Sequence, residues 1–287
     1  MPDTWLAVPP PVRTLFQRFP LVVHPAEPLP ARAPDHPRRR PKLHVFATDH
    51  DALRGLPSYN PTCLKWQTLL RIARIPVDLV PSNNHASPSG ALPFLLPASS
   101  DPRPDIPLTG RRILHYAERH CPQAAATPRQ EAYLSLLAQS IRPAWLYTLY
   151  VDPTHTDLLA RLYLPAARPT RGLLLRSLRS AAADEVRRTT RRPLLQPEPL
   201  YADAERAFAA LSAVLGRDEW FFGARQPGLF DADVFAYTYL ILDGSLGWRG
   251  DALRECVSKC GNLVRHRDRL FQRCWGWKVG HDDDDAV

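Results

Sequence analysis

Residues 59–80 read YNPTCLKWQTLLRIARIPVDLV. Pro61 suits the first position of an α-helix, and apolar residues recur at helical spacing over 61–74. After a short connection, the run PVDLV predicts a β-strand over 76–80. A helix joined so directly to a strand indicates a small sheet with helices packed against it.

The segments on either side extend this pattern. Residues 43–48, LHVFAT, alternate in polarity and predict a short strand, followed by a polar loop over 49–60. Downstream, PFLL at 93–96 predicts another strand, and LTGRRILHYAERHCP at 108–122 predicts an amphipathic helix. The order β-α-β, then β and α, fits a mixed sheet covered by helices, which is an α/β domain.

The second half of the chain is helical in pattern. Helices are predicted over 128–150, 155–164, 171–189, 201–215, 231–242, 250–259 and 262–275. We therefore expect an α/β domain over 42–121 and an all-helical domain over 128–279, joined by the linker 122–128. A Pro- and Arg-rich extension (1–41) precedes them, and an acidic tail (280–287) follows.

The formal net charge of +8 predicts attraction to polyanions, such as nucleic acid, anionic lipid headgroups or acidic proteins. An even scatter of arginine that serves solubility explains the charge equally well. The sequence has neither a zinc-finger spacing nor a basic motif interleaved with aromatic residues, so we expect no nucleic-acid partner. Apolar runs fall far short of the roughly 18–20 residues that cross a bilayer, so we expect no membrane span.

The five cysteines are an odd number without a C-x-x-C pair, which predicts reduced thiols. Cys256 and Cys260 stand four residues apart, a spacing that matches no standard zinc pattern, so no metal site is expected. Near the amino terminus, a helical turn or two over 12–19 would present apolar side chains to a partner surface. These are Leu15, Phe16 and Phe19.

Residues 167–197, ARPTRGLLLRSLRSAAADEVRRTTRRPLLQP, are the most basic stretch of the helical half. From 168 to 192 the segment carries eight arginines against two carboxylates, a local charge of +6. Its predicted apolar side consists of Leu173, Leu174, Leu178, Ala181 and Ala182. The segment is either a solvated helix or a surface for anionic headgroups or acidic partner proteins. The candidate contact residues are Arg171, Arg187, Arg188, Arg191 and Arg192.

Two further motifs point to a known architecture. GALPFLL at 90–96 puts Pro93 directly before a strand, where proline is typically cis and exposes its neighbour's backbone to a peptide or thiol ligand. WFFGARQPGLFDADVFAYTYL at 220–240 puts Asp231 at the head of a helix. Together they resemble the glutathione-transferase architecture, an α/β, thioredoxin-like N-terminal domain followed by an all-α C-terminal domain. The resemblance covers about residues 42–277.

Within that superfamily, the chain resembles the metaxins. NPTCLKWQTLLRIARIPVDLV at 60–80 is similar to a metaxin segment with a Cys-Leu-Lys helix start. GNLVRHRDRLFQRCW at 261–275 is similar to the final metaxin helix. The chain ends WGWKVGHDDDDAV in place of a hydrophobic anchor. It therefore looks like the smaller peripheral fungal metaxin-like subunit, the 35 kDa type, of the mitochondrial sorting and assembly machinery.

This resemblance implies a non-enzymatic role without a cofactor. Metaxin-like subunits belong to the machinery that inserts β-barrel precursors into the mitochondrial outer membrane. The implied location is that membrane's cytosolic face, in peripheral contact with its surface. The implied partners are the β-barrel insertase subunit, a second metaxin-like subunit and β-barrel precursor proteins.

Cys63 raises the alternative of a glutathione transferase or thiol enzyme, since a helix N-terminus lowers the pKa of an exposed thiol. In thiol-active members of the superfamily, the reactive group precedes the helix-opening proline. Here Asn60, a carboxamide, stands at that position and cannot act as a nucleophile. Glutathione-binding members also place Glu or Gln before Ser where this chain has Thr109 and Gly110. We therefore expect Cys63 to be a packing residue.

Asp231 is predicted to be structural as well. In transferase-like folds this Asp forms a buried capping box with a Ser or Thr, but Gly228 stands at that position here. Loss of the remaining cap should cost about 1–2 kcal/mol. A transferase-like module of a translation complex, which would use the basic surface near RNA, is a third hypothesis for the whole chain.

Overall fold

The computed structural model describes residues 37–120, 128–164 and 171–276. From Arg38 on, the described residues belong to one compact unit. Most of the predicted extension, including Leu15, Phe16 and Phe19, lies outside the described residues, as does the predicted tail 280–287.

In the described part of the chain, four strands form a mixed sheet. They are β1 (Lys42–Val45), β2 (Asp78–Pro81), β3 (Phe94–Leu96) and β4 (Leu108–Thr109), in the order β2-β1-β3-β4. β1 is parallel to β2 and antiparallel to β3, so Leu43 lies opposite Leu79 on one side and Leu95 on the other. The predicted strands are present. The helix predicted over 108–122 is wrong at its start, because Leu108 and Thr109 form β4 and the helix begins at Arg111.

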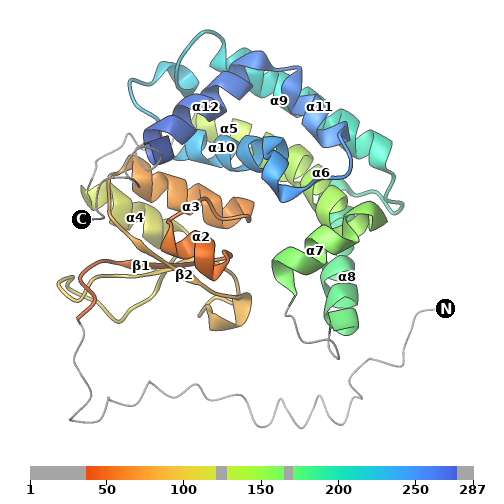
Figure 1. Ribbon diagram of the computed structural model, residues 1–287. Helices are drawn as coiled ribbons and strands as arrows, with labels where there is room; N and C mark the ends of the chain where they lie inside the picture. Colours follow the sequence, from red (N-terminus) through yellow and green to blue (C-terminus); the bar gives the residue numbers. More distant parts are fainter. Residues whose placement is uncertain (1–36, 121–127, 165–170, 277–287) are drawn as a thin grey trace, which may run out of the picture. The chain divides into compact units, whose positions relative to one another are not determined.

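The sheet is accompanied by α2 (Asp49–Leu53), α3 (Pro61–Ile72), a 3₁₀ turn (Asn84–Ala86) and α4 (Arg111–His120). The predicted loop over 49–60 is wrong in its first part, where α2 forms. Thr48 caps this short helix by accepting a hydrogen bond from the Asp51 amide at 3.1 Å. Figure 1 shows α3 and α4 on the side of the sheet that faces the helical half of the chain.

The helical half starts with one continuous helical path: α5 (Pro128–Leu136), a π-helical turn (Leu137–Ile141), α6 (Arg142–Leu146) and a second π-helical turn (Tyr147–Val151). Then come α7 (Thr156–Tyr163), α8 (Arg171–Thr190), α9 (Pro197–Leu215), α10 (Leu229–Leu242), α11 (Ala252–Ser258) and α12 (Gly261–Trp275). Single 3₁₀ turns connect some of them, at Pro153–His155, Phe221–Gly223 and Gly244–Leu246. Every predicted helical segment is present. α9 begins earlier than predicted because Pro197 occupies its first turn.

Two hydrophobic cores hold the elements together. Leu43, Leu69, Leu95 and Ile113 are fully buried in the core between the sheet, α3 and α4. Trp145, Phe208, Phe235 and Leu263 are buried in the larger core between the helices. α3 also contributes Leu64 and Ile72 to the helical core, and it packs along α10. Each fully buried side chain of this size contributes about 1.5–3 kcal/mol, so α3 is firmly fixed between the two cores.

None of the helices in the described ranges combines the length and apolar composition that a bilayer span requires. The described residues also contain no group of three or more His, Cys, Asp or Glu side chains that could hold a metal ion.

Candidate functional site

Cys63, the candidate nucleophile, lies at the sheet-facing side of α3. Its side chain is completely buried in the core of the sheet. Burial raises the pKa of the Cys63 thiol to about 12, although hydrogen bonds with the Phe46 backbone and Ser58 act in the opposite direction. The effect of the helix N-terminus is therefore outweighed, and the thiol is protonated and inaccessible at neutral pH.

Asn60 stands where a reactive group would stand, and both ends of its amide are engaged. Its Oδ1 caps α3 by accepting hydrogen bonds from the amides of Thr62 at 3.0 Å and Cys63 at 3.2 Å. Its Nδ2 donates a hydrogen bond to the Tyr163 hydroxyl at 3.1 Å. Asn60 is thus a capping residue that also ties the start of α3 to the end of α7.

Tyr163 belongs to a group of aromatic side chains above the start of α3, which we call the aromatic plug: Phe46, Tyr59, Tyr150 and Tyr163. The Tyr163 ring meets Phe46 at a centroid distance of 5.0 Å and Tyr59 at 5.4 Å, both edge to face. Its ring lies 5.5 Å from that of Tyr150. The sequence gives no signal for this plug, because its members come from four separate segments that share no spacing.

The Leu92–Pro93 peptide bond is cis, as the sequence predicted. Leu92 and Pro93 are both buried. The Leu92 amide, which a peptide ligand would use, already donates a hydrogen bond to Asn84 Oδ1 at 3.0 Å. Thr109 pairs with Phe94 in the sheet. Thr109 and Gly110 have no carboxylate with which to bind the amino group of glutathione.

Asp231 lies in the helical core, apart from Cys63 and Pro93. Its carboxylate accepts hydrogen bonds from the amides of Phe221 at 3.0 Å and Gly228 at 2.9 Å. Gly228 is the N-cap of α10 but has no side chain, so only the acidic half of the capping box exists, as expected.

Asp231 has a further partner that the sequence analysis did not foresee. Its Oδ1 lies 2.9 Å from Nε2 of His266 in α12, and both side chains are buried. The imidazole is flanked edge-on by Trp220 and Phe221. A lone His on an apolar helix face gave no signal for this pair. The arrangement joins α10, α12 and the turn between α9 and α10, which is a structural role.

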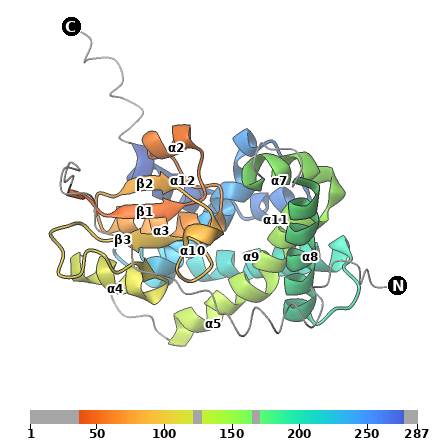
Figure 2. The same ribbon diagram turned by 90° about the horizontal axis from the view of Figure 1, so that it is seen from below.

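α8 carries the predicted basic segment and lies away from the sheet, at the far side of the helices (Figure 2). The predicted apolar side is wrong in part, because Leu173, Leu174 and Ala181 are exposed. The side that packs runs through Leu175, Ala182 and Val186 instead. The exposed fractions of Leu173 and Leu174 are 58% and 39%. These two leucines are apolar surface beside the arginines of the segment, and they make this part of α8 a candidate contact surface.

The arginines of this segment divide into paired and unpaired groups. Arg187 pairs with Asp184 at 3.0 Å, and Arg192 pairs with Asp203 of α9 at 2.7 Å. Arg188 donates only to the Asp184 carbonyl, at 3.3 Å. Arg171 and Arg191 have no ion pair with any residue that the structure describes.

Arg176 is exposed and also has no ion pair with a described residue. We call the set Arg171, Leu173, Leu174 and Arg176 the α8 surface. A cavity of about 490 Å³ lies beside it, lined by Gly172, Leu175, Arg176 and Arg179 among others.

Comparison with known proteins agrees with this geometry. The model for the glutathione S-transferase N-terminal domain matches residues 61–155, and the model for the C-terminal domain matches residues 204–270. Among solved structures, a glutathione transferase from Phanerochaete chrysosporium superposes with a TM-score of 0.58 at 14% identity. It covers 82% of this chain and 97% of its own. A glutathione S-transferase of Ceriporiopsis subvermispora, solved with glutathione, gives 0.56 at 12% identity, covering 82% and 98%. These likenesses establish the fold.

Similarity to characterised sequences is more specific. Metaxin-3 of Xenopus laevis is 30% identical over 236 residues, which is 76% of this chain and 72% of that protein. The Metaxin-1 homolog of Drosophila melanogaster is 26% identical over 79% of this chain and 71% of its own length. Metaxin-1 of Mus musculus is 28% identical, over 67% and 63%.

Proposed function

This chain belongs to the metaxin family, and on that premise we propose that it is a non-enzymatic subunit of the mitochondrial outer-membrane machinery that inserts β-barrel proteins. The observation that carries the proposal is the closed start of α3. A transferase fold is present, but Asn60 caps the helix and is bound to Tyr163 of the aromatic plug, and Cys63 is buried in the core of the sheet. The scaffold supports binding while the groups that glutathione chemistry requires are replaced or sealed.

The α8 surface supports a peripheral attachment. Fully burying a leucine contributes about 1.5–3 kcal/mol, so covering the part of Leu173 and Leu174 that is exposed contributes roughly half of that for each. Each arginine near an anionic membrane surface adds about 1 kcal/mol. We propose that this surface contacts the membrane or the insertase barrel on the cytosolic side. The barrel, a second metaxin-like subunit and β-barrel precursors are the proposed partners. The correspondence to the smaller fungal subunit stays a prediction of the sequence resemblance.

Glutathione transfer is the alternative function, because the fold is shared with transferases that bind glutathione. A conjugation assay with glutathione and a chlorinated dinitrobenzene separates the two functions. We expect no turnover above the uncatalysed rate. Turnover that disappears in Cys63→Ala would establish the enzyme instead.

The direct test is recovery of tagged chain from mitochondria in mild detergent. We expect an outer-membrane β-barrel protein to co-purify with it. The variant Leu173→Ser/Leu174→Ser should lose most of this recovery with only a small decrease in melting temperature, since both side chains are at least partly exposed. Leu194→Ser is the matched control, because Leu194 is 73% exposed but lies outside the α8 surface. Recovery with ribosomes and no barrel would contradict the proposal.

A further inference from the structure

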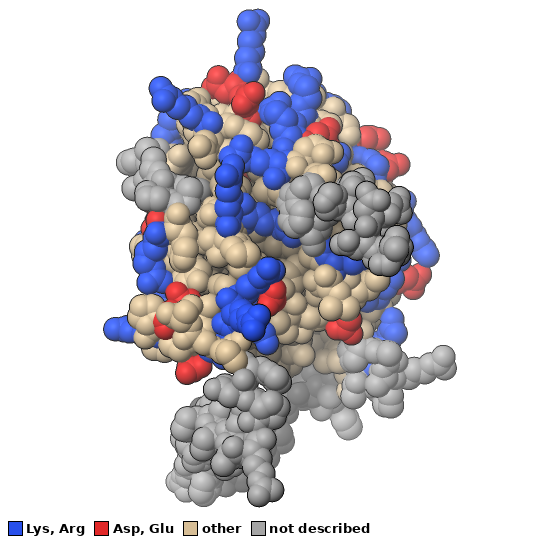
Figure 3. Space-filling view, turned by 60° about the vertical axis from the view of Figure 1, so that its left-hand side comes forward, with Lys and Arg blue, Asp and Glu red and all other residues tan. Residues whose placement is uncertain are grey.

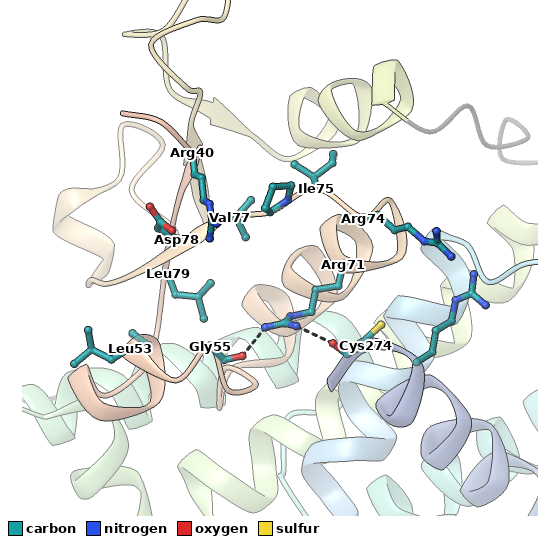
Figure 4. Close-up of a pocket in the computed structure, with 13 residues that line it drawn as sticks. Arg40, Leu53, Gly55, Arg71, Arg74, Ile75, Val77, Asp78, Leu79 and Cys274 are labelled. Carbon is teal, nitrogen blue, oxygen red and sulfur yellow. Dashed lines mark hydrogen bonds between the residues drawn. The ribbon is translucent and has the colours of Figure 1, made fainter. Parts of the chain in front are cut away.

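A cavity of about 630 Å³ opens at the carboxyl end of α3 (Figure 4). Its walls come from α2, the last turn of α3, β2 and the end of α12, together with Arg40 from the segment before β1. The cavity is independent of the function proposed above, because it shares no residue with the aromatic plug or the α8 surface.

Arg71 forms part of the cavity wall and is held in a fixed position. Its guanidinium donates hydrogen bonds to the carbonyl oxygens of Cys274 at 2.7 Å and Gly55 at 2.6 Å, drawn as dashed lines in Figure 4. It also lies over the Trp275 ring, 4.8 Å from the centroid. Both hydrogen-bond partners are neutral carbonyls, so its positive charge has no counter-ion among the described residues.

Three more arginines lie around Arg71, and among the described residues their side chains form no ion pair or hydrogen bond. These are Arg40, Arg74 and Arg273, all exposed. Elsewhere arginines do find carboxylates, such as Arg142 with Glu185 at 2.6 Å. Figure 3 shows a face on which Lys and Arg side chains outnumber Asp and Glu.

The net charge around the cavity shows whether the protein's own negative groups neutralise these arginines. Four arginines and one carboxylate line the cavity: Arg40, Arg71, Arg74, Arg273 and Asp78. α3 and α12 both end here, and each helix C-terminus acts as about −0.5 charge. Four positive charges against one carboxylate and two helix ends leave a net charge of about +2. The cavity therefore attracts an anionic ligand.

The dimensions and the apolar rim indicate what kind of anion fits. A second cavity, of about 720 Å³, adjoins the first and shares Arg40, Arg74, Ile75 and Pro76 with it. Leu53, at the end of α2, is 88% exposed on the rim of the first cavity, where Leu79 also lies. Two adjoining hollows with arginines and exposed leucine suit an extended chain better than a small ion or a flat membrane surface.

We propose that this double cavity binds an extended acidic segment of a partner protein, with an apolar residue of leucine size against Leu53. The carboxylates of the segment lie against Arg74 and Arg273, and Arg71 supplies a fixed charge at the floor. No chemistry on the peptide is required, so the site is one of recognition.

Fluorescence anisotropy on the purified full chain tests this proposal. The probe is a labelled peptide of about 12 residues built from repeated Asp-Leu-Glu-Glu, roughly 40 Å long when extended. We expect Arg74→Gln/Arg273→Gln to weaken binding about tenfold at low salt. The control Arg217→Gln/Arg265→Gln removes the same charge from exposed positions that line neither cavity and should change binding less than about twofold.

Leu53→Ser tests the apolar part of the proposal. The variant should bind the leucine-containing peptide about fivefold more weakly. Its affinity for the same peptide with serine in place of leucine should not change. Equal losses in both arginine pairs would overturn the proposal, since they would show diffuse charge attraction. Binding that appears only after residues 280–287 are removed would make this chain's acidic tail the occupant. If anionic lipid vesicles displace the peptide from the unmodified chain, and bind Arg74→Gln/Arg273→Gln more weakly, the occupant would be a membrane surface. Both outcomes would overturn a partner segment as the ligand.

Discussion

The two ends of α3 differ in what they offer to other molecules. At its start, Asn60 and Cys63 occupy the region where transferases hold their reactive group, yet the aromatic plug and burial close it. At its end, Arg71 and Arg74 line an open cavity with unneutralised charge. The same helix therefore has a start whose side chains are covered, the sealed end, and a carboxyl end that lines a cavity, the open end. The comparison predicts that a transferase scaffold without a reactive group at the start of this helix still binds a partner at its other end.

The largest loss of stability is expected at the contact between α10 and α12. The end of α12 forms one wall of the cavity at the open end. Asp231→Ala removes the acceptor for the Phe221 and Gly228 amides and leaves His266 without its partner. Each buried donor left without its acceptor costs about 1–3 kcal/mol, so we expect a total loss of about 3–5 kcal/mol, measured by denaturant unfolding. This exceeds the ~1–2 kcal/mol of a simple helix cap. A loss within that smaller range would show that His266 contributes nothing.

Opening the sealed end is expected to have the next largest effect. Tyr163→Ala removes a ring that packs against Phe46 and Tyr59 and accepts the Asn60 hydrogen bond. We expect a loss of about 2–4 kcal/mol in unfolding free energy. The control Tyr163→Phe keeps the ring and should lose about 1 kcal/mol. Acquisition of glutathione turnover in Tyr163→Ala would show that the plug alone silences a competent site.

Cys63→Ala is a milder test of the same end. The thiol is fully buried, so the variant loses a small apolar contact and should be less stable by about 1 kcal/mol. Reaction with a thiol reagent under native conditions should also be slow at Cys63, since burial raises the pKa of its thiol to about 12. Fast labelling of Cys63 in the folded protein would contradict a sealed end.

The sequence predicted the features that depend on neighbouring residues. The α3–β2 stretch, the cis bond at Pro93 and the acidic half of the Asp231 cap all follow from local signals. α2 was missed because a five-residue helix in a polar loop depends on one capping residue, Thr48.

Contacts between distant segments could not be predicted in this way. The Asp231–His266 pair, the aromatic plug and the arginines at the end of α3 are assembled from separate elements. The exposed side of α8 was misassigned for a related reason. An amphipathic pattern gives the period of a helix, but which side is buried depends on its neighbours. The arginines offered only one signal, the high overall Arg content.

The smallest expected effect is a change in how stability depends on pH. It involves His155, just before α7, the helix that ends with Tyr163 at the sealed end. His155 is buried, and burial lowers the pKa of its imidazole, with Asp152 acting in the opposite direction and Arg249 reinforcing the shift. The Arg249 amide lies 3.3 Å from Nε2 and donates to it, which favours the neutral ring.

Because the pKa of His155 is lower in the folded protein, the unfolded chain binds more protons at mildly acidic pH. Stability from this group is complete above the unfolded value of about 6.5 and is lost as pH falls from there through the lower folded value. The slope for one proton cannot exceed about 1.4 kcal/mol per pH unit.

His155→Gln keeps an acceptor for the Arg249 amide but cannot titrate, so its melting temperature should fall less between pH 7 and pH 5 than that of the natural chain. His44, whose pKa is also lowered, is present in both proteins and cancels in the comparison. Parallel pH profiles would mean that His155 is solvated as it titrates and that α7 is not held at the sealed end by a neutral ring.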